Sequence, residues 1–330
     1  MLSRTANALT WMARYMERAE ASARLAEVNL TLSLDLQGQS QEAWDAVVAT
    51  TGDLEAFNKH YGAATRDNAL QFLVLDVDNP NSVANALSQA RENARTVREH
   101  LPSEAWELLN SLYLLLKPAA SGEPGQREGL LDSVKDCARQ LEGLLDATLL
   151  RDEGWHFVQI GRFLERADQT SRLVDVQHAL LEGRTEDPAR ELRWESVLKS
   201  ATGLTMYRRK HGATEGRRVA QFLLLSQTFP RSVAFCLASA DAALRGLQGT
   251  PPGQFRNPAE KALGRLTFRL SYTELDDVLG QGVHAWLDHL QLELLDVGAA
   301  LDATYFDPGA SAPGQDSYEQ PEQQQQQRLQ

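Results

Sequence analysis

Apolar residues recur at spacings of three and four along most of this chain, which is the period of an amphipathic helix. The clearest seam runs from Val83 to Val97, and the last apolar stretch, from Val283 to Leu301, keeps the same spacing. No stretch alternates apolar and polar residues for long enough to indicate a strand. The pattern therefore predicts an all-α fold, with the seams forming its core.

Prolines, glycines and polar clusters divide the pattern into separate elements. Turns are expected at 118–125 and 249–258, where prolines and glycines gather. The predicted helices cover 2–36, 41–57, 66–75, 80–97, 102–116, 130–150, 154–181, 194–202, 219–226, 230–247, 259–270 and 283–301.

One stretch of the chain occurs twice. The segments 14–28 and 162–176 share seven of fifteen residues, and later matches such as Trp44 with Trp194 continue at nearly the same offset. A repeat this long indicates a duplicated subdomain and not a solenoid of short units. We expect one helical domain over 1–306, built from units 1–150 and 151–306. The tail, 307–330, is rich in glutamine, proline and glycine and is expected to be disordered.

Composition excludes several classes of function. Of the 330 residues, 42% are hydrophobic and the net charge is −12, which disfavours nucleic acid as a main partner. The two cysteines, Cys137 and Cys236, make neither a disulfide framework nor a metal set. No apolar run approaches the ~18 residues of a membrane span, and no signal peptide is evident. We expect a cytoplasmic protein without membrane contact.

No phosphate-binding loop or nucleophile elbow is present, so no cofactor is expected on this chain. Glu153 and His156 have the Glu-x-x-His spacing of helical di-iron sites, but such sites need two of these motifs. The first unit has no histidine at the matching position. No metal site is therefore expected, and His156 is interpreted as a helix-start residue with a local hydrogen bond.

A basic cluster stands out in this acidic chain, and two interpretations of it stay open. It is either a solvated loop and helix start or a weak anion site, since arginine forks and a helix N-terminus favour anions. Its candidate residues are Arg208, Arg209, Lys210 and Arg217.

The repeated segments carry matching charges, which are the main candidates for a substrate- or partner-binding site. They are Arg14, Glu17, Arg18 and Arg24 in the first unit and Arg162, Glu165, Arg166 and Arg172 in the second. One interpretation is an exposed face whose charges pair along each helix, as Arg14–Glu17 and Glu20–Arg24 can, with Arg162–Glu165 and Asp168–Arg172 as counterparts. Alternatively, the two long helices meet near a pseudo-two-fold axis and the charges face each other, partly buried, or receive a ligand's carboxylate or phosphate.

Several ordered motifs resemble the bacterial alpha-E domain family over about residues 1–306. They are Leu2-Ser-Arg4, Trp11-Met-Ala-Arg-Tyr-Met-Glu-Arg-Ala-Glu20, Asn79-Pro-Asn-Ser-Val83, Ala90-Arg-Glu-Asn-Ala-Arg95, Gly161-Arg-Phe-Leu-Glu-Arg-Ala-Asp168 and Phe229-Pro-Arg-Ser-Val233. The resemblance implies an all-helical protein that occurs beside, or fused to, circularly permuted ATP-grasp proteins, often near transglutaminase-like proteins. It implies that ATP and Mg²⁺ are bound by a partner subunit, since this chain carries no ATP-grasp segment.

Three functions are compatible with the sequence. The leading hypothesis is an auxiliary subunit, without nucleotide, of an ATP-grasp-type amide ligase acting on a peptide or amino-acid-like substrate. The second is a helical scaffold that organises partner proteins without touching substrate. The third is a free-standing enzyme that uses Glu17 or Glu165 as a general base.

Overall fold

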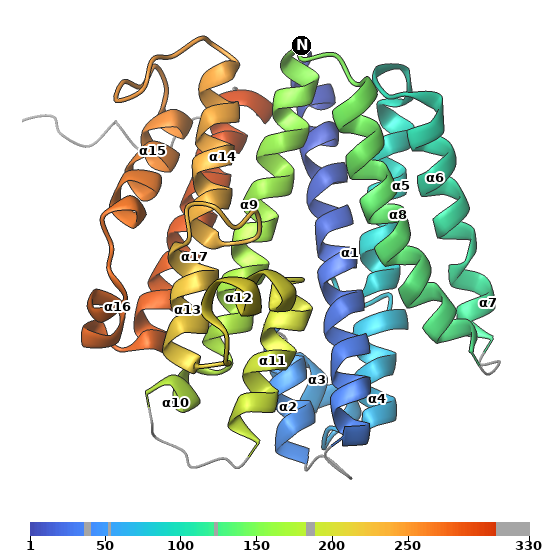
Figure 1. The fold of residues 1–330 in the computed structure, drawn as a ribbon. Coiled ribbons are helices and arrows are strands. Elements are labelled where there is room, and N and C mark those ends of the chain that lie inside the picture. The colour runs from blue at the N-terminus through green and yellow to red at the C-terminus, as the bar shows by residue number, and fades with distance from the viewer. Residues whose placement is uncertain (36–40, 52–53, 122–124, 183–188, 308–330) are drawn as a thin grey trace, which may run out of the picture.

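Helices make up the whole of the regular structure in the computed structural model, which describes residues 1–35, 41–51, 54–121, 125–182 and 189–307 (Figure 1). No strand occurs within these ranges, so the predicted all-α fold is confirmed. No helix there is long and apolar enough to cross a membrane. The expected disordered tail lies, from residue 308 onward, outside the described residues.

The helices follow one another in the same order in both halves of the chain. The first half contains α1 (Ser3–Asp35), α2 (Gln41–Ala49), α3 (Leu54–Tyr61), α4 (Arg66–Leu70), η1 (Gln71–Leu75), α5 (Val83–Thr96), η2 (Arg98–His100), α6 (Ser103–Leu114), α7 (Leu116–Ala120) and α8 (Gln126–Thr148). The second contains α9 (Glu153–Asp175), α10 (His178–Leu181), α11 (Arg190–Ser200), α12 (Leu204–His211), α13 (Gly216–Leu225), α14 (Val233–Gly246), α15 (Pro258–Ser271), α16 (Leu275–Gln281), α17 (Val283–Leu301) and η3 (Asp302–Phe306). Apart from α10, each element of the second half before η3 has a counterpart in the first. The division into units 1–150 and 151–306 stays a prediction.

Helices α1 and α9 lie side by side in the middle of the molecule and run in the same direction (Figure 1). The two helices are nearly in register along their length: the amino group of Met1 meets Glu153 at one end, and Arg18 meets Glu165 farther along. Parallel packing of equivalent helices is what a two-fold axis along their common direction produces. The duplicated charges therefore lie between the two helices.

The apolar seams form the core around this central pair, as predicted. Equivalent positions are buried in both halves, including Trp44 with Trp194, Phe57 with Tyr207, Leu73 with Leu223, and Leu87 with Leu237. Burial of side chains of this size supplies most of the free energy that holds the helices together.

The loops before α5 and α14 are fixed to the central helices by equivalent hydrogen bonds. Ser22 of α1 donates its hydroxyl to the carbonyl oxygen of Asn81 (2.9 Å), and Thr170 of α9 donates to the carbonyl oxygen of Arg231 (2.9 Å). In each loop the following serine caps the next helix. Residues 81 and 231 are therefore held in matching positions beside the charged faces of α1 and α9.

The structure differs from the predicted elements in several places, and two of its helices, α12 and α16, were not predicted at all. The expected helix over 41–57 is two helices, α2 and α3. The expected helix over 154–181 ends at Asp175, where the turn tightens and Gln177 N–H donates to Val174 O (3.0 Å). Pro118, expected in a turn, lies in the first turn of α7, where the missing N–H of proline would have no helical partner.

Close approach of α1 and α9 requires a glycine at position 161. A Cβ atom built on Gly161 would lie 2.2 Å from the carbonyl oxygen of Thr10, which is backbone and cannot rotate away. Gly161→Ala should therefore push the helices apart and lower the free energy of unfolding by about 1–3 kcal/mol.

Gly143→Ala, in the middle of α8 with no atom within 4 Å of its Cβ, is the matched control. There the change removes only the entropic cost of glycine and should raise the free energy of unfolding by up to about 1 kcal/mol. Urea unfolding of both variants makes the comparison. Equal effects would contradict the close contact between α1 and α9.

Candidate functional site

Glu165 of α9 is held by two arginines of α1. Its carboxylate accepts hydrogen bonds from Arg18 Nε (2.7 Å) and Nη2 (3.1 Å) and from Arg14 Nε (2.9 Å). The pair with Arg18 is bidentate, which is the strongest geometry for a guanidinium and a carboxylate. Gln169 Nε2 adds a fourth bond at 3.1 Å. The Glu165 side chain is 0% exposed, so every interaction that keeps it charged comes from the protein.

The reciprocal pair joins Arg166 of α9 to Glu17 of α1. Arg166 donates through Nε (3.0 Å) and Nη2 to the two oxygens of Glu17, and Nη2 also reaches Glu142 of α8 at 3.2 Å. Arg162 contacts Glu142 at 2.9 Å instead of Glu17. Each central helix thus offers a glutamate to the arginine of the other, as a two-fold relation between the helices would produce.

A third buried carboxylate, Glu20, lies one turn farther along α1. It binds Arg24 on its own helix (2.6 Å) and Arg231 from the loop before α14 (2.7 Å). The matching carboxylate of the second half, Asp168, pairs with Arg172 at 2.9 Å.

Two of these carboxyl groups have strongly lowered pKa values. Burial alone would raise the pKa of Glu165, but Arg18 and Arg14 outweigh it and lower the pKa to about 2. Burial likewise opposes ionisation of Glu20, and Arg231 and Arg24 overcome it to give a pKa of about 2. Burial would lower the pKa of Arg166, but the charge of Glu17 raises it. All three groups are therefore charged near neutral pH.

The prediction of an exposed, self-paired face is wrong, because Glu17, Glu20, Glu165 and Arg166 are all buried. Two expected pairs along the helices do form, Glu20–Arg24 and Asp168–Arg172. In place of the other two, Arg14 binds Glu165 and Arg162 binds Glu142. The alternative in which the charges meet between the long helices is confirmed.

A cavity of about 400 Å³ opens beside these pairs. It is bounded by α1, α9, α17, η3 and the segments around Thr51 and Asn81. Its charged lining comprises Arg14, Arg18, Asp168, Arg172 and Asp302, and its polar uncharged lining comprises Ser22, Thr51, Asn81 and Gln169. Arg14, stacked over Trp11 at 4.6 Å, and Arg18 are 20% and 16% exposed, so they contact both Glu165 and the cavity.

The two halves differ at the mouth of this cavity. In one half, the guanidinium of Arg231 fills the space against Glu20. In the other half, the matching residue is Asn81, which has no charge, and the segment 76–82 contains no basic residue. Among the described residues, the one ion pair of Asp168 is with Arg172. The cavity beside Asn81 therefore corresponds to the place that the Arg231 guanidinium fills on the other side of the helix pair.

A comparison with known families matches residues 1–306 to Alpha-E, described as a predicted alpha-helical domain with a conserved ER motif. The chain belongs to the Alpha-E family. Its sequence contains the dipeptide Glu-Arg twice, as Glu17-Arg18 and Glu165-Arg166, and the structure joins these two dipeptides in reciprocal ion pairs. We call them the ER pairs below.

Uncharacterized proteins of Mycobacterium bovis and Mycobacterium tuberculosis are 26% identical to this Alpha-E chain over 336 residues. The alignment covers 92% of this chain and 37% of each relative, so the chain spans little more than a third of their length. No solved structure matches the chain.

The other candidate residues are not brought together at the ER pairs of this Alpha-E domain. Arg208 pairs with Glu195, and Arg217 pairs with Asp276 at 2.6 Å, while Arg209 and Lys210 are exposed. This distribution fits the solvated interpretation of the basic cluster.

His156 differs from its expected role. Its Nδ1 is buried with no hydrogen-bond partner among the described residues, and the ring packs where a Cβ on Gly246 would lie. A larger cleft of about 830 Å³, lined by Arg245, Phe255 and Phe268 among others, lies near α14 and α15, and no residue of the ER pairs lines it.

Sequence reasoning missed Glu142, Arg231, Asn81 and Asp302. Arg231 could have been found by comparing the two copies, since Pro80-Asn-Ser and Pro230-Arg-Ser differ at that one charged position. Glu142 and Asp302 carry no such signal.

Glu165→Gln should lower the free energy of unfolding by about 3–5 kcal/mol, because it leaves two partly buried arginine charges without their carboxylate. Glu92→Gln is the control, since Glu92 is an exposed carboxylate paired with Arg95 at i, i+3. That change should cost about 0.5 kcal/mol or less. Urea unfolding at neutral pH measures both, and a small loss for Glu165→Gln would contradict the buried pairing.

The same pairing predicts how stability depends on pH. A carboxyl group with a folded pKa of about 2 and an ordinary value of 4.5 stabilises the protein fully above about pH 5. That contribution is lost as pH falls through this window toward 2. The difference in unfolding free energy between wild type and Glu165→Gln should therefore shrink between pH 5 and the acid limit of folding. A difference that stays constant would contradict the lowered pKa.

Proposed function

We propose that this Alpha-E domain is the auxiliary part, without nucleotide, of an ATP-grasp-type amide ligase, and that it holds a peptide or amino-acid-like substrate in the cavity beside the ER pairs. The observation that carries the proposal is the asymmetry of that cavity. Arginines line it, and within the part of the chain that the structure describes the carboxylate of Asp168 lacks the second cation that Arg231 gives to its counterpart Glu20.

The arginines of the lining suit a carboxylate. Hydrogen bonds to Glu165 use Nε of Arg14 and Nε and Nη2 of Arg18. A guanidinium has five N–H donors, so the terminal nitrogens of Arg14 remain for a ligand. The buried Glu165 fixes both side chains, which lowers the entropy lost when a ligand binds.

The acidic groups of the lining suit an amine. Glu20 binds two guanidinium groups, whereas its counterpart Asp168 pairs with one. A ligand ammonium beside Asp168 would take the place that Arg231 occupies in the other half. Asp302 adds a second acidic group to the lining, and burial raises its pKa. A ligand with both a carboxylate and an amine matches this pattern, and 400 Å³ is within the usual range for small-molecule sites.

Amide ligases of the ATP-grasp type activate a carboxylate as an acyl phosphate and pass it to an amine. In this proposal the partner binds ATP and Mg²⁺, and the helical domain positions the substrate. The family resemblance supplies the ligase, with a transglutaminase-like protein as a further associate. The longer mycobacterial relatives, in which the matching region is about a third of the chain, fit a domain that works with a second part.

A scaffold without substrate contact is the second candidate. It is favoured by the ER pairs themselves, which neutralise each other and need no ligand to be satisfied. The third hypothesis has little support at Glu165, because a carboxylate with a pKa of about 2 is a poor general base near neutral pH.

The variant Asn81→Arg distinguishes the substrate-holding role from the role of a scaffold without substrate contact. The change gives the first half the arginine of the second, so the new guanidinium should pair with Asp168 and fill the cavity. We expect an unchanged or higher melting temperature and a loss of about tenfold or more in the rate of the reconstituted ligase pair, equivalent to ~1.4 kcal/mol.

Val77→Arg is the matched control, because Val77 lies in the same segment, is 66% exposed and does not line the cavity. It adds the same charge and should leave the rate unchanged. Copurification with the ATP-grasp partner is measured on both variants. Normal partner binding with a normal rate for Asn81→Arg would eliminate the substrate-holding role and leave the scaffold.

A further inference from the structure

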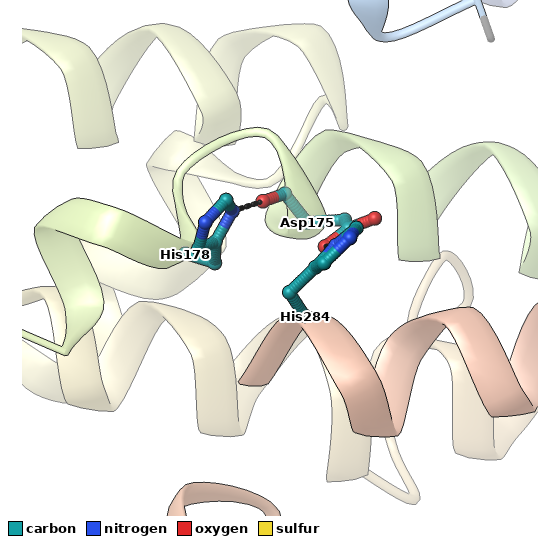
Figure 2. Close-up of side chains that lie close together, drawn as sticks. All are labelled: Asp175, His178 and His284. Atoms are coloured by element: carbon teal, nitrogen blue, oxygen red, sulfur yellow. Dashed lines mark hydrogen bonds and ion pairs between the residues drawn. The ribbon is translucent and has the colours of Figure 1, made fainter. Parts of the chain in front are cut away.

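Two histidines and an aspartate gather where the second half of the chain changes direction. Asp175 is the last residue of α9, His178 is the first of α10, and His284 lies in the first turn of α17 (Figure 2). One potential ligand atom from each residue lies within 4.8 Å of the others. Residues 178 and 284 are far apart in sequence, so no spacing motif reveals this group.

His178 has the hydrogen bond that orients a metal-binding imidazole. Its Nδ1 lies 2.9 Å from the backbone carbonyl oxygen of Asp175, as the dashed line in Figure 2 marks. A carbonyl can only accept, so Nδ1 carries the proton and Nε2 has the free lone pair. Histidines that bind metals usually donate their second ring nitrogen in this way.

His284 lies against the side-chain carboxylate of Asp175. Its Nδ1 lies 2.8 Å from Asp175 Oδ1, and its ring stacks on that of His178 with centroids 5.0 Å apart. A backbone contact holds the two helix ends together, since Val283 N–H donates to Glu182 Oε1 at 2.8 Å. The start of α17 is therefore fixed against α10 before any ion is present.

We propose that Asp175, His178 and His284 form a binding site for a divalent transition metal ion, Zn²⁺ in the first instance. Two imidazoles and one carboxylate are a set of donors that Zn²⁺ accepts, with a fourth position left for water. Zn–N and Zn–O bonds of about 2.0–2.2 Å place donors roughly 3.3 Å apart in a tetrahedron. The His284 side chain is 62% exposed, so it can rotate to close the remaining distance.

The site belongs to the second half alone. At the offsets of the repeat, the matching residues in the first half are Glu27, Leu30 and Glu128, and Glu27 pairs with Lys135. Helix α1 continues through this level, whereas α9 ends at Asp175, and that break places His178 at the carbonyl of Asp175. Bound Zn²⁺ would join the end of α9 to the start of α17, and both helices line the cavity beside the ER pairs.

Calorimetric titration of the chelator-treated full chain with Zn²⁺ tests the proposal. At about pH 8, where histidine is neutral and ligates best, we expect saturable binding of one ion per chain. His178→Ala and His284→Ala should each lower the affinity by about 100-fold or more, beyond what the loss of a supporting hydrogen bond costs. Zn²⁺ should raise the melting temperature of wild type and not of these variants.

His289→Ala is the matched control, because His289 is an equally exposed histidine on α17 that is not part of the group. It should bind Zn²⁺ as wild type does. Thermal melts of the metal-free chains verify that the variants fold. If either of the two variants His178→Ala and His284→Ala does not fold, a fourth variant, Asp175→Asn, tests the contribution of the carboxylate to Zn²⁺ binding. No saturable one-to-one binding, or equal affinity in all variants, would overturn the proposal and leave a hydrogen-bonded His–Asp–His group.

Discussion

Charge neutralisation inside the helix pair is the constraint on which this structure depends. Moving an isolated carboxylate away from water costs several kcal/mol, and a glutamate with 0% exposure persists as an anion only if the protein surrounds it with cations. Arg14 and Arg18 do so for Glu165, and Arg166 does so for Glu17. Because the paired groups come from different helices, the α1–α9 contact and the ion pairs depend on each other.

The duplication explains why such a costly arrangement is self-consistent. Two parallel helices related by a two-fold axis bring equivalent faces together, so a helix with adjacent glutamate and arginine presents each charge to its opposite on the partner. One ER dipeptide on each helix therefore suffices to form two reciprocal bridges. Gly161 allows the helices to approach closely enough for these bridges to form.

Divergence between the copies created the features that a strict repeat would not have. Arg231 neutralises Glu20 in one half, while Asn81 leaves a cavity beside Asp168 in the other. The break after Asp175 gathers two histidines that have no counterpart in the first copy. The ligand and metal sites that we propose lie at these differences, since the matched positions are already satisfied by the protein.

The local pattern of apolar and polar residues predicts most of the helices of this fold, but it predicts few of the contacts in the candidate site. Helix positions and the apolar seams follow from a period of 3.6 residues, so they were predictable. The ion-pair partner of Arg14 was not predictable from the sequence. The i, i+3 spacing makes Glu17 reachable on the same helix, and only the packing of α9 against α1 brings Glu165 to Arg14 instead. Asp302, His178 and His284 reach their sites through tertiary contacts between segments far apart in sequence, which no local spacing encodes.

The most direct test compares two double-mutant cycles on Arg14. One combines Arg14→Met with Glu165→Gln across the helices, and the other combines Arg14→Met with Glu17→Gln along α1. Urea unfolding should give an interaction energy of about 0.5–3 kcal/mol for Arg14 with Glu165. For Arg14 with Glu17 it should give no more than about 0.5 kcal/mol. The reverse order, with Arg14 coupled to Glu17 and independent of Glu165, would contradict the cross-helix pairing.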